Sequence, residues 1–142
     1  MASADVYSAI RTHLETNWAA TPLVFENEDY SPTTGVHWIQ VEMAGTYYGR
    51  ESFGTDNAFT DRWEEQGLLV FSVMIPAYAG VQIGRGYLKD MADLFRGVAL
   101  MSGRLEFLDA KVGFGENVPG DNTNDGNWYR LDMVIDWRVI DR

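Results

Sequence analysis

The sequence predicts an α+β fold, a mainly antiparallel sheet with two helices packed on one face and long loops. Two segments carry apolar residues at the helical period, and strand-like segments separate and follow them. The order is helix, two strands, long loop, strand, helix, then two or three strands. A length of 142 residues without a repeat or a linker predicts a single domain, residues 1–142.

The first helix is expected over about residues 4–17. Ser3 suits its N-cap, and Asp5 suits its first turn, where the helix dipole favours negative charge. Its apolar stripe recurs every four residues, at Val6, Ile10, Leu14 and Trp18.

Two strands should follow the first helix. Leu23–Phe25 is a short apolar run after Pro22, and His37–Met43 alternates between apolar and polar residues. Trp38 lies on the polar side of the second strand, where we expect it to cover an edge or a partner.

Gly45–Arg62 is predicted to be a long loop, because it shows no sustained period. It is unusually aromatic for a passive loop, and aromatic residues are favoured at interfaces. We expect the loop to become ordered on assembly. Its candidate contacts with a partner are Tyr47, Tyr48, Arg50, Phe53, Phe59 and Arg62.

Leu68–Ile75 is a continuous apolar run that Pro76 ends, which is typical of a central strand. A second helix is predicted over about Val81–Phe95. Its buried stripe should comprise Tyr87, Leu88, Met91, Leu94 and Phe95. The glycines at 80, 84 and 86 lack the Gly-Lys-Ser/Thr ending of a phosphate-binding loop, so they indicate close helix packing instead.

Short strands are expected at Leu105–Leu108 and Lys111–Phe114, followed by a polar loop over about Gly115–Asn127. From Trp128 onward, apolar and charged residues alternate for about a dozen positions, which predicts a long antiparallel strand with one wet face. The charges on that face suit cross-strand pairs within one chain and suit ion pairs across a subunit boundary equally well. The candidate inter-subunit residues are Asn122, Asp125, Arg130, Asp132, Asp136 and Arg138.

Catalytic and metal-binding patterns are weak. His13 and His37 have no ligand-spaced partners, and the sequence contains no cysteine. Glu64 and Glu65 would point to opposite faces of a strand, and we interpret both as solvent-side charges. Asp121–Asn127 matches a calcium loop only in part and is better explained as a polar turn. We therefore expect no enzyme activity, cofactor or metal.

The chain carries 21 acidic and 11 basic residues, a formal net charge of −10, which disfavours binding to the nucleic-acid backbone. No apolar run is long enough to span a membrane, and the first residues lack the features of a secretory leader. We expect a product that is made and assembled in the cytoplasm.

Five short motifs occur in order along the chain: Thr21–Asn27, Trp38–Val41, Gly67–Val70 leading into Ile75-Pro76, Leu94–Gly97 and Trp128–Trp137. Taken together, they resemble the tail-terminator family of long-tailed bacteriophages and related phage-like particles. They span most of the chain and include no catalytic signature.

The resemblance implies a virion structural protein at the head-proximal end of the tail. Such a protein forms a homohexameric ring that caps the tail tube, stops its polymerisation and meets the head-completion (connector, or stopper) protein. DNA would only pass through the lumen. We expect Gly45–Arg62 to contact the tube and Asn117–Asn127 to contact a neighbouring subunit or the head side.

Other functions remain open at the level of sequence. The nearest alternatives are another neck or head-completion protein, or a tail-tube subunit, which would polymerise into long tubes instead of stopping at one ring. A further alternative is a small-ligand-binding domain with an aromatic pocket built from Trp38, Tyr87 and Trp137. A specific thermal shift with a ligand would favour that last alternative.

Overall fold

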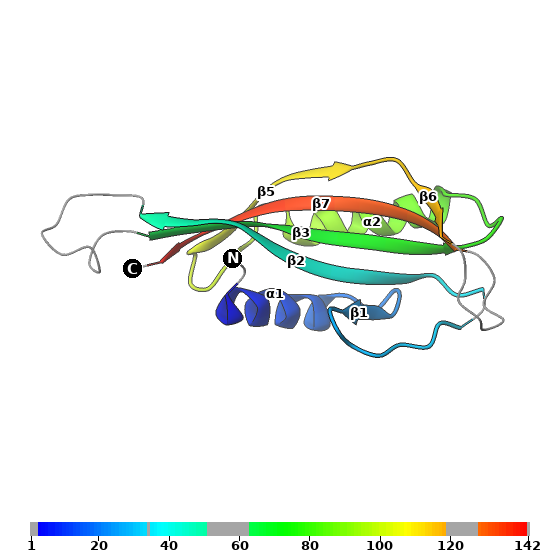
Figure 1. The fold of residues 1–142 in the computed structure, drawn as a ribbon, viewed down its shortest axis with the longest axis horizontal. Coiled ribbons are helices and arrows are strands. Elements are labelled where there is room, and N and C mark those ends of the chain that lie inside the picture. Colours follow the sequence, from blue (N-terminus) through cyan, green and yellow to red (C-terminus); the bar gives the residue numbers. More distant parts are fainter. Residues whose placement is uncertain (1–2, 34, 51–62, 119–127, 142) are drawn as a thin grey trace, which may run out of the picture.

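The computed structural model of the chain describes residues 3–33, 35–50, 63–118 and 128–141. Within these ranges the chain forms two helices and one seven-stranded sheet (Figure 1). The elements are α1 (Ala4–Asn17), β1 (Leu23–Phe25), β2 (Trp38–Arg50), β3 (Trp63–Pro76), α2 (Gln82–Phe95), β4 (Ala99–Leu100), β5 (Leu105–Val112), β6 (Glu116–Val118) and β7 (Trp128–Asp141). The predicted α+β class is confirmed.

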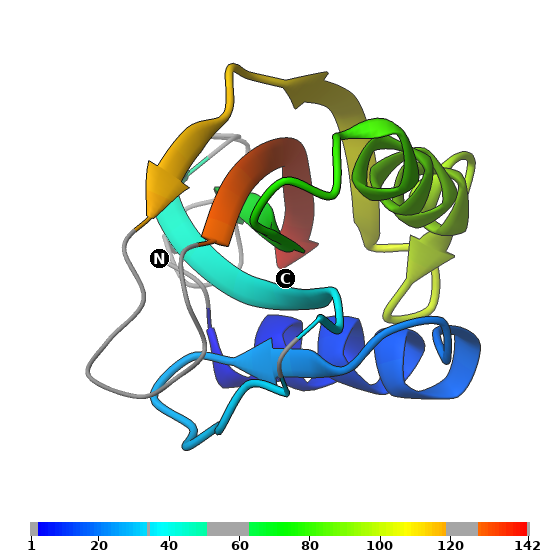
Figure 2. The same cartoon turned by 90° about the vertical axis from the view of Figure 1, so that its right-hand side faces the viewer.

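The sheet has the strand order β1-β2-β3-β7-β5-β4, and β6 pairs with β7 beyond the end of β5. β1 runs parallel to β2, whereas every other pairing is antiparallel, so the sheet is mixed rather than purely antiparallel. Figure 2 looks along the strands and shows that the sheet is strongly curled. Long twisted strands and the bulges in β2 and β5 both favour such curvature.

Helix α1 begins and packs as its sequence predicts. The Ser3 hydroxyl accepts a hydrogen bond from the backbone N–H of Val6, which satisfies one of the unpaired donors at the helix start. Val6, Ile10 and Leu14 are fully buried against the sheet.

Helix α2 approaches the sheet closely because Gly84 has no side chain. A Cβ at Gly84 would lie 2.4 Å from Cδ1 of Ile75, a distance that real Cβ atoms do not tolerate. The close packing predicted for the glycines of this segment is therefore confirmed at Gly84, whereas a Cβ at Gly80 or Gly86 would meet nothing within 4 Å. Leu88, Met91 and Phe95 are buried further along the helix, while the predicted Tyr87 and Leu94 are only half-buried.

One face of the sheet forms the core together with both helices. The buried residues of α1 and α2 join a single cluster with alternate residues of β2, β3 and β7. The predicted alternation of the last strand is confirmed, with a buried series of Leu131, Met133, Ile135, Trp137 and Val139. The opposite face, which we call the helix-free face, carries the charged residues of β7.

Two predicted loops are partly strand. Gly45–Arg50, the first part of the predicted loop Gly45–Arg62, continues β2, and β3 begins directly after that loop, at Trp63. Residues 51–62 lie outside the described residues. A register shift between Gly45 and Tyr47 breaks the period-two pattern, which explains why the sequence looked irregular. Residues 116–118, expected in a polar loop, form β6 against β7.

The two short strands expected after α2 are one. β5 runs from Leu105 to Val112, and the register shift between Phe107 and Ala110 divides the apolar pattern into two apparent segments. The two-residue strand β4 was too short to predict.

Candidate assembly surfaces

The β2–β3 hairpin extends past the end of helix α1 (Figure 1). Tyr47 and Tyr48, near the end of β2, are each 46% exposed. The Tyr48 ring stacks on Trp63, with 5.6 Å between ring centroids and an interplanar angle of 25°. These rigid, half-exposed aromatic side chains form what we call the hairpin end, a surface well suited to contact another protein.

Tyr47 and Tyr48 are consecutive in β2 and therefore point to opposite faces of the hairpin, and the preceding bulge determines which face each occupies. After the register shift, Tyr47 lies opposite Gln66 and Tyr48 lies opposite Glu65. A Cβ at Gly49 would lie 2.3 Å from the Tyr47 hydroxyl oxygen, so Gly49 leaves room for this ring to lie along the strand. The hairpin end therefore presents an aromatic surface on both sides.

Glu64 and Glu65 point to opposite faces, as predicted, but they are not both solvent-side charges. The Glu65 side chain is buried, with 3% of the residue exposed, and its Oε1 accepts a hydrogen bond from the backbone N–H of Ser3 at 2.7 Å. Glu64 lies on the helix-free face and accepts a hydrogen bond from Nε2 of Gln66 at 2.7 Å. Glu65 thus ties the start of α1 to the hairpin, which sequence patterning alone did not indicate.

The charged residues of β7 pair mainly within the chain. Arg130 forms an ion pair with Glu116 of β6, and its Nε lies 3.4 Å from Oδ1 of Asp132. On the same face, Nε of Arg138 lies 3.0 Å from Oε1 of Glu106. Of the two arrangements that the sequence left open, the monomer already contains the cross-strand one for Arg130 and Arg138, whereas Asp132 pairs with Arg130 within β7.

Acidic residues outnumber basic residues on the helix-free face. Its charged members with described side chains are Glu42, Glu64, Glu106, Glu116, Asp132 and Asp136 against Lys111, Arg130 and Arg138. Asp136 forms no ion pair with any residue that the structure describes. The described residues of the helix-free face therefore carry a net charge of 3 − 6, or −3.

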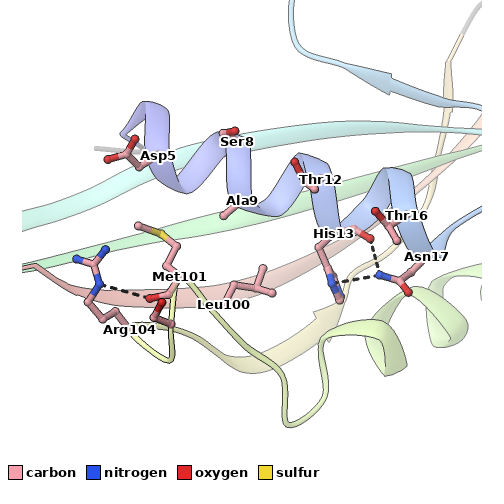
Figure 3. A pocket seen from close by; sticks show the side chains of 11 residues that line it. Asp5, Ser8, Ala9, Thr12, His13, Thr16, Asn17, Leu100, Met101 and Arg104 are labelled. Atoms are coloured by element: carbon pink, nitrogen blue, oxygen red, sulfur yellow. Dashed lines mark hydrogen bonds between the residues drawn. The ribbon is translucent and has the colours of Figure 1, made fainter.

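A hollow of about 620 Å³ lies between α1 and the turn that joins β4 to β5 (Figure 3). His13 borders it, but its Nε2 lies 2.9 Å from the Leu94 carbonyl oxygen and its Nδ1 lies 3.3 Å from Nδ2 of Asn17. Because both ring nitrogens have hydrogen-bond partners, His13 is not placed to transfer protons to a bound substrate.

The predicted aromatic ligand pocket does not form. Trp137 is 1% exposed within the core, whereas Trp38 lies on the opposite face of the sheet and contacts Tyr30 and Trp128. Tyr87 instead meets His37 edge to face, with 5.5 Å between ring centroids. These three aromatic residues therefore do not line one cavity.

Several predicted site residues lie outside the described ranges. They are Phe53, Phe59, Arg62, Asn122, Asp125 and the calcium-like string Asp121–Asn127. Among the residues that the structure does describe, no group of three or more histidine or acidic side chains is arranged to hold a metal ion. No helix in these ranges is long and apolar enough to cross a membrane.

The chain is similar in fold to several proteins of known structure. Fourteen solved chains match, and one of them aligns over 95% of its length with 96% of this chain, at a TM-score of 0.65 and 16% sequence identity. The name of that chain states no function. No protein-family model matches the sequence, and no curated protein is similar to it. At this identity the likeness defines the fold class alone: a two-helix α+β chain with a curled sheet.

Proposed function

We propose that the chain is a non-catalytic virion protein, the tail terminator of a long-tailed bacteriophage or a related phage-like particle. Six copies form a ring that caps the tail tube, stops its growth and receives the head-completion protein. The observation that carries the proposal is the hairpin end, a rigid strand pair that extends past α1 and exposes Tyr47 and Tyr48 beside Trp63.

The hairpin end is the proposed contact with the tube. Stacked aromatic side chains supply a large contact area and lose little side-chain entropy on binding, which suits a surface that binds the completed tube. The other end of β3 leads through Pro76 to Tyr78, which is fully exposed, and this end is the proposed head side.

The acidic balance of the chain supports passage of DNA without binding. Six copies bring a formal charge of 6 × −10, or −60, into one ring. A lumen that shares this sign repels the phosphate backbone, so the genome can slide through the ring. The helix-free face, with its acidic excess, is the proposed lining of that lumen.

Light scattering and negative-stain images, taken with and without tail-tube protein, test the proposal. A six-subunit ring, or rings that cap tubes and shorten them, is the expected result. Long tubes made of this chain alone would instead identify a tube subunit. A monomer that ignores tubes would leave the terminator function without support.

A tyrosine pair makes the test specific for the hairpin end. Tyr47→Ala removes a 46% exposed tyrosine at the proposed tube contact, and Tyr78→Ala removes a fully exposed tyrosine near the opposite end of β3. We expect the first variant to cap tubes at least about tenfold more weakly and the second to cap normally, since interface aromatics commonly dominate binding. Equal capping by the two variants would place the tube contact elsewhere.

A further inference from the structure

Helix α2 and strand β5 leave a groove between them that the core does not fill, which we call the α2–β5 groove. It consists of two adjoining hollows of about 290 and 260 Å³, which share Lys89, Ala92 and Ala110 as lining residues. Figure 1 shows β5 rising away from the rest of the sheet beside α2. The bulge between Phe107 and Ala110 accompanies this divergence.

The floor of the α2–β5 groove is apolar. Leu88 and Phe95 of α2 and Met133 and Ile135 of β7 line it, and each is no more than 2% exposed. The outer wall is strand β5, whose residues from Leu108 to Val112 are all exposed. Leu108 is 54% exposed and Val112 is 46% exposed, so apolar side chains stand in solvent along an uncovered strand. Such a patch is typical of a protein contact.

The charge of the groove side differs from that of the rest of the chain. The charged residues that line the groove are Arg85, Lys89 and Arg96 against Asp93 and Asp109, a net charge of +1 in a protein whose net charge is −10. Asp93 forms ion pairs with both Lys89 and Arg96. Residues 3–50 carry two basic and six acidic side chains, a net charge of −4. The acidic segment includes β1 and β2, at the opposite end of the strand order from β5. The chain is therefore polarised from one sheet edge to the other.

We propose that the α2–β5 groove binds a second copy of this chain through the exposed acidic loop that follows β1. In this loop Glu28 pairs with Arg11 and Glu26 accepts a hydrogen bond from the backbone N–H of Met43, whereas Asp29 is exposed and forms no ion pair with the described residues. Copies with a net charge of −10 repel one another, so contacts between patches of opposite local charge are favoured. A contact between two different surfaces of one chain repeats from copy to copy, and it closes into a ring where the rotation between copies allows closure. This inference rests on the proposed function only for the number of copies, six, at which the ring closes.

A charge-swap experiment tests this contact. Arg85 lines the groove and forms no ion pair with the described residues, and Asp29 is exposed on the acidic loop. We expect Arg85→Glu and Asp29→Lys each to weaken self-association by about tenfold or more, because each places like charges in contact.

Mixing the two variants should restore assembly. In an alternating ring, the new glutamate of one chain meets the new lysine of the next, and the remaining contacts are wild type. The mass distribution of the mixture, measured by light scattering and native mass spectrometry, should return to that of the wild type. Variants that assemble normally on their own, or a mixture that stays dissociated, would overturn the proposal.

A second pair of variants tests the apolar wall. Val112→Asp places a charge in the groove wall, while Ile83→Asp places the same charge on an exposed position of α2 that does not line the groove. Ile83 and Arg85 point in opposite directions because two helical positions are about 200° apart. Val112→Asp should abolish self-association with an unchanged melting temperature, and Ile83→Asp should leave both unchanged. Equal effects of the two variants would contradict the groove contact.

The outcomes separate this inference from the proposed function. Rings that cap tubes but ignore Arg85→Glu, Asp29→Lys and Val112→Asp would retain the terminator function and remove the α2–β5 groove from the interface. Charge-swap rescue in a protein that never caps tubes would retain the groove contact and remove the terminator function. A wild-type chain that stays monomeric at millimolar concentration would overturn the groove contact directly.

Discussion

Gly67 is the residue on which the burial of Trp137 depends. A Cβ at Gly67 would lie 2.2 Å from the Ala44 carbonyl oxygen and 2.2 Å from Cζ2 of Trp137, so the largest buried side chain occupies the space that a methyl group would need. We expect Gly67→Ala to lower the free energy of unfolding by about 2 kcal/mol, since overpacked cores respond in this range. Guanidinium denaturation measures this change.

Gly86→Ala provides the matched control for that substitution. Gly86 lies within α2, and a Cβ there would meet nothing within 4 Å. The same change should therefore raise the free energy of unfolding by about 0.5 to 1 kcal/mol through helix propensity. Similar destabilisation by both alanines would mean that Gly67 is not confined by Trp137.

His37 makes stability depend on pH near neutrality. Its Nε2 is buried without a hydrogen-bond partner among the described residues, and burial lowers the pKa of His37 below its usual 6.5. The unfolded chain therefore binds this proton more tightly than the folded chain does. As a result, the free energy of unfolding keeps its full value above pH 6.5 and falls as the pH drops from 6.5 to the pKa of His37 in the folded chain. His37→Phe keeps a ring beside Tyr87 and should remove this fall.

Thermal unfolding of both proteins between about pH 5 and pH 8 measures the difference, because the acidic residues titrate equally in the two chains. Parallel melting curves over this range would contradict a lowered pKa at His37.

At the scale of elements, the turn between β4 and β5 holds two residues other than glycine in the left-handed region. Met101 has φ 54° and Ser102 has φ 59°, and the N–H of Gly103 donates to the Leu100 carbonyl oxygen at 3.1 Å. Side chains are disfavoured in this conformation, which glycine adopts freely. We expect Ser102→Gly to raise the free energy of unfolding by about 0.5 to 1 kcal/mol.

Ser8→Gly is the control for the turn. Ser8 is an exposed position of α1 with right-handed helical backbone, where the same change should lower stability by about 0.5 kcal/mol. Urea denaturation of both variants gives the two changes, and a loss of stability at position 102 would show that the serine side chain itself supports the turn.

Elements with an unbroken period were predictable from the sequence. Helix α1 and strand β7 keep one period over their whole length, and the structure confirms both. β2 and β5 contain bulges, and a single extra residue reverses which side chains face the core. The pattern was therefore lost at Tyr47 in β2 and between Phe107 and Ala110 in β5, where the predicted segments ended too early.

The candidate surfaces were predictable where residue type alone determines them. The aromatic content around Tyr47 and Tyr48 indicated an interface candidate, but their stacking partner and the faces they occupy depend on the bulge. Glu65 was misinterpreted because its hydrogen bond to Ser3 joins residues 62 positions apart. The α2–β5 groove escaped prediction because it is a space between elements, and no sequence period encodes such a space.

At the scale of the whole molecule, the fold turns a dispersed charge into a directional one. Along the sequence, acidic residues are spread without a long run of like charge. The strand order places the acidic segment, residues 3–50, and the α2–β5 groove toward opposite ends of the sheet, while the helix-free face retains its own acidic excess. The proposed ring around DNA would require two such sides of different charge and one surface that repels DNA.

The repulsive surface gives the last prediction. Glu42 and Asp136 lie on the helix-free face and form no ion pair with the described residues. Lysine at both positions therefore adds four charges to each copy without breaking a described ion pair, which amounts to 6 × 4, or +24, in six copies. If this face lines the lumen, rings with Glu42→Lys and Asp136→Lys should retain double-stranded DNA in a gel-shift assay, while wild-type rings release it.

Raising the salt from about 50 to 200 mM should free the DNA again, because counterion release drives such binding. Glu15→Lys and Asp90→Lys, at exposed positions on α1 and α2, form the control with the same total charge. Retention by the control ring would show that net charge alone captures DNA. Release by both rings would place the helix-free face on the outside of the assembly, where it would be free to meet the head-completion protein.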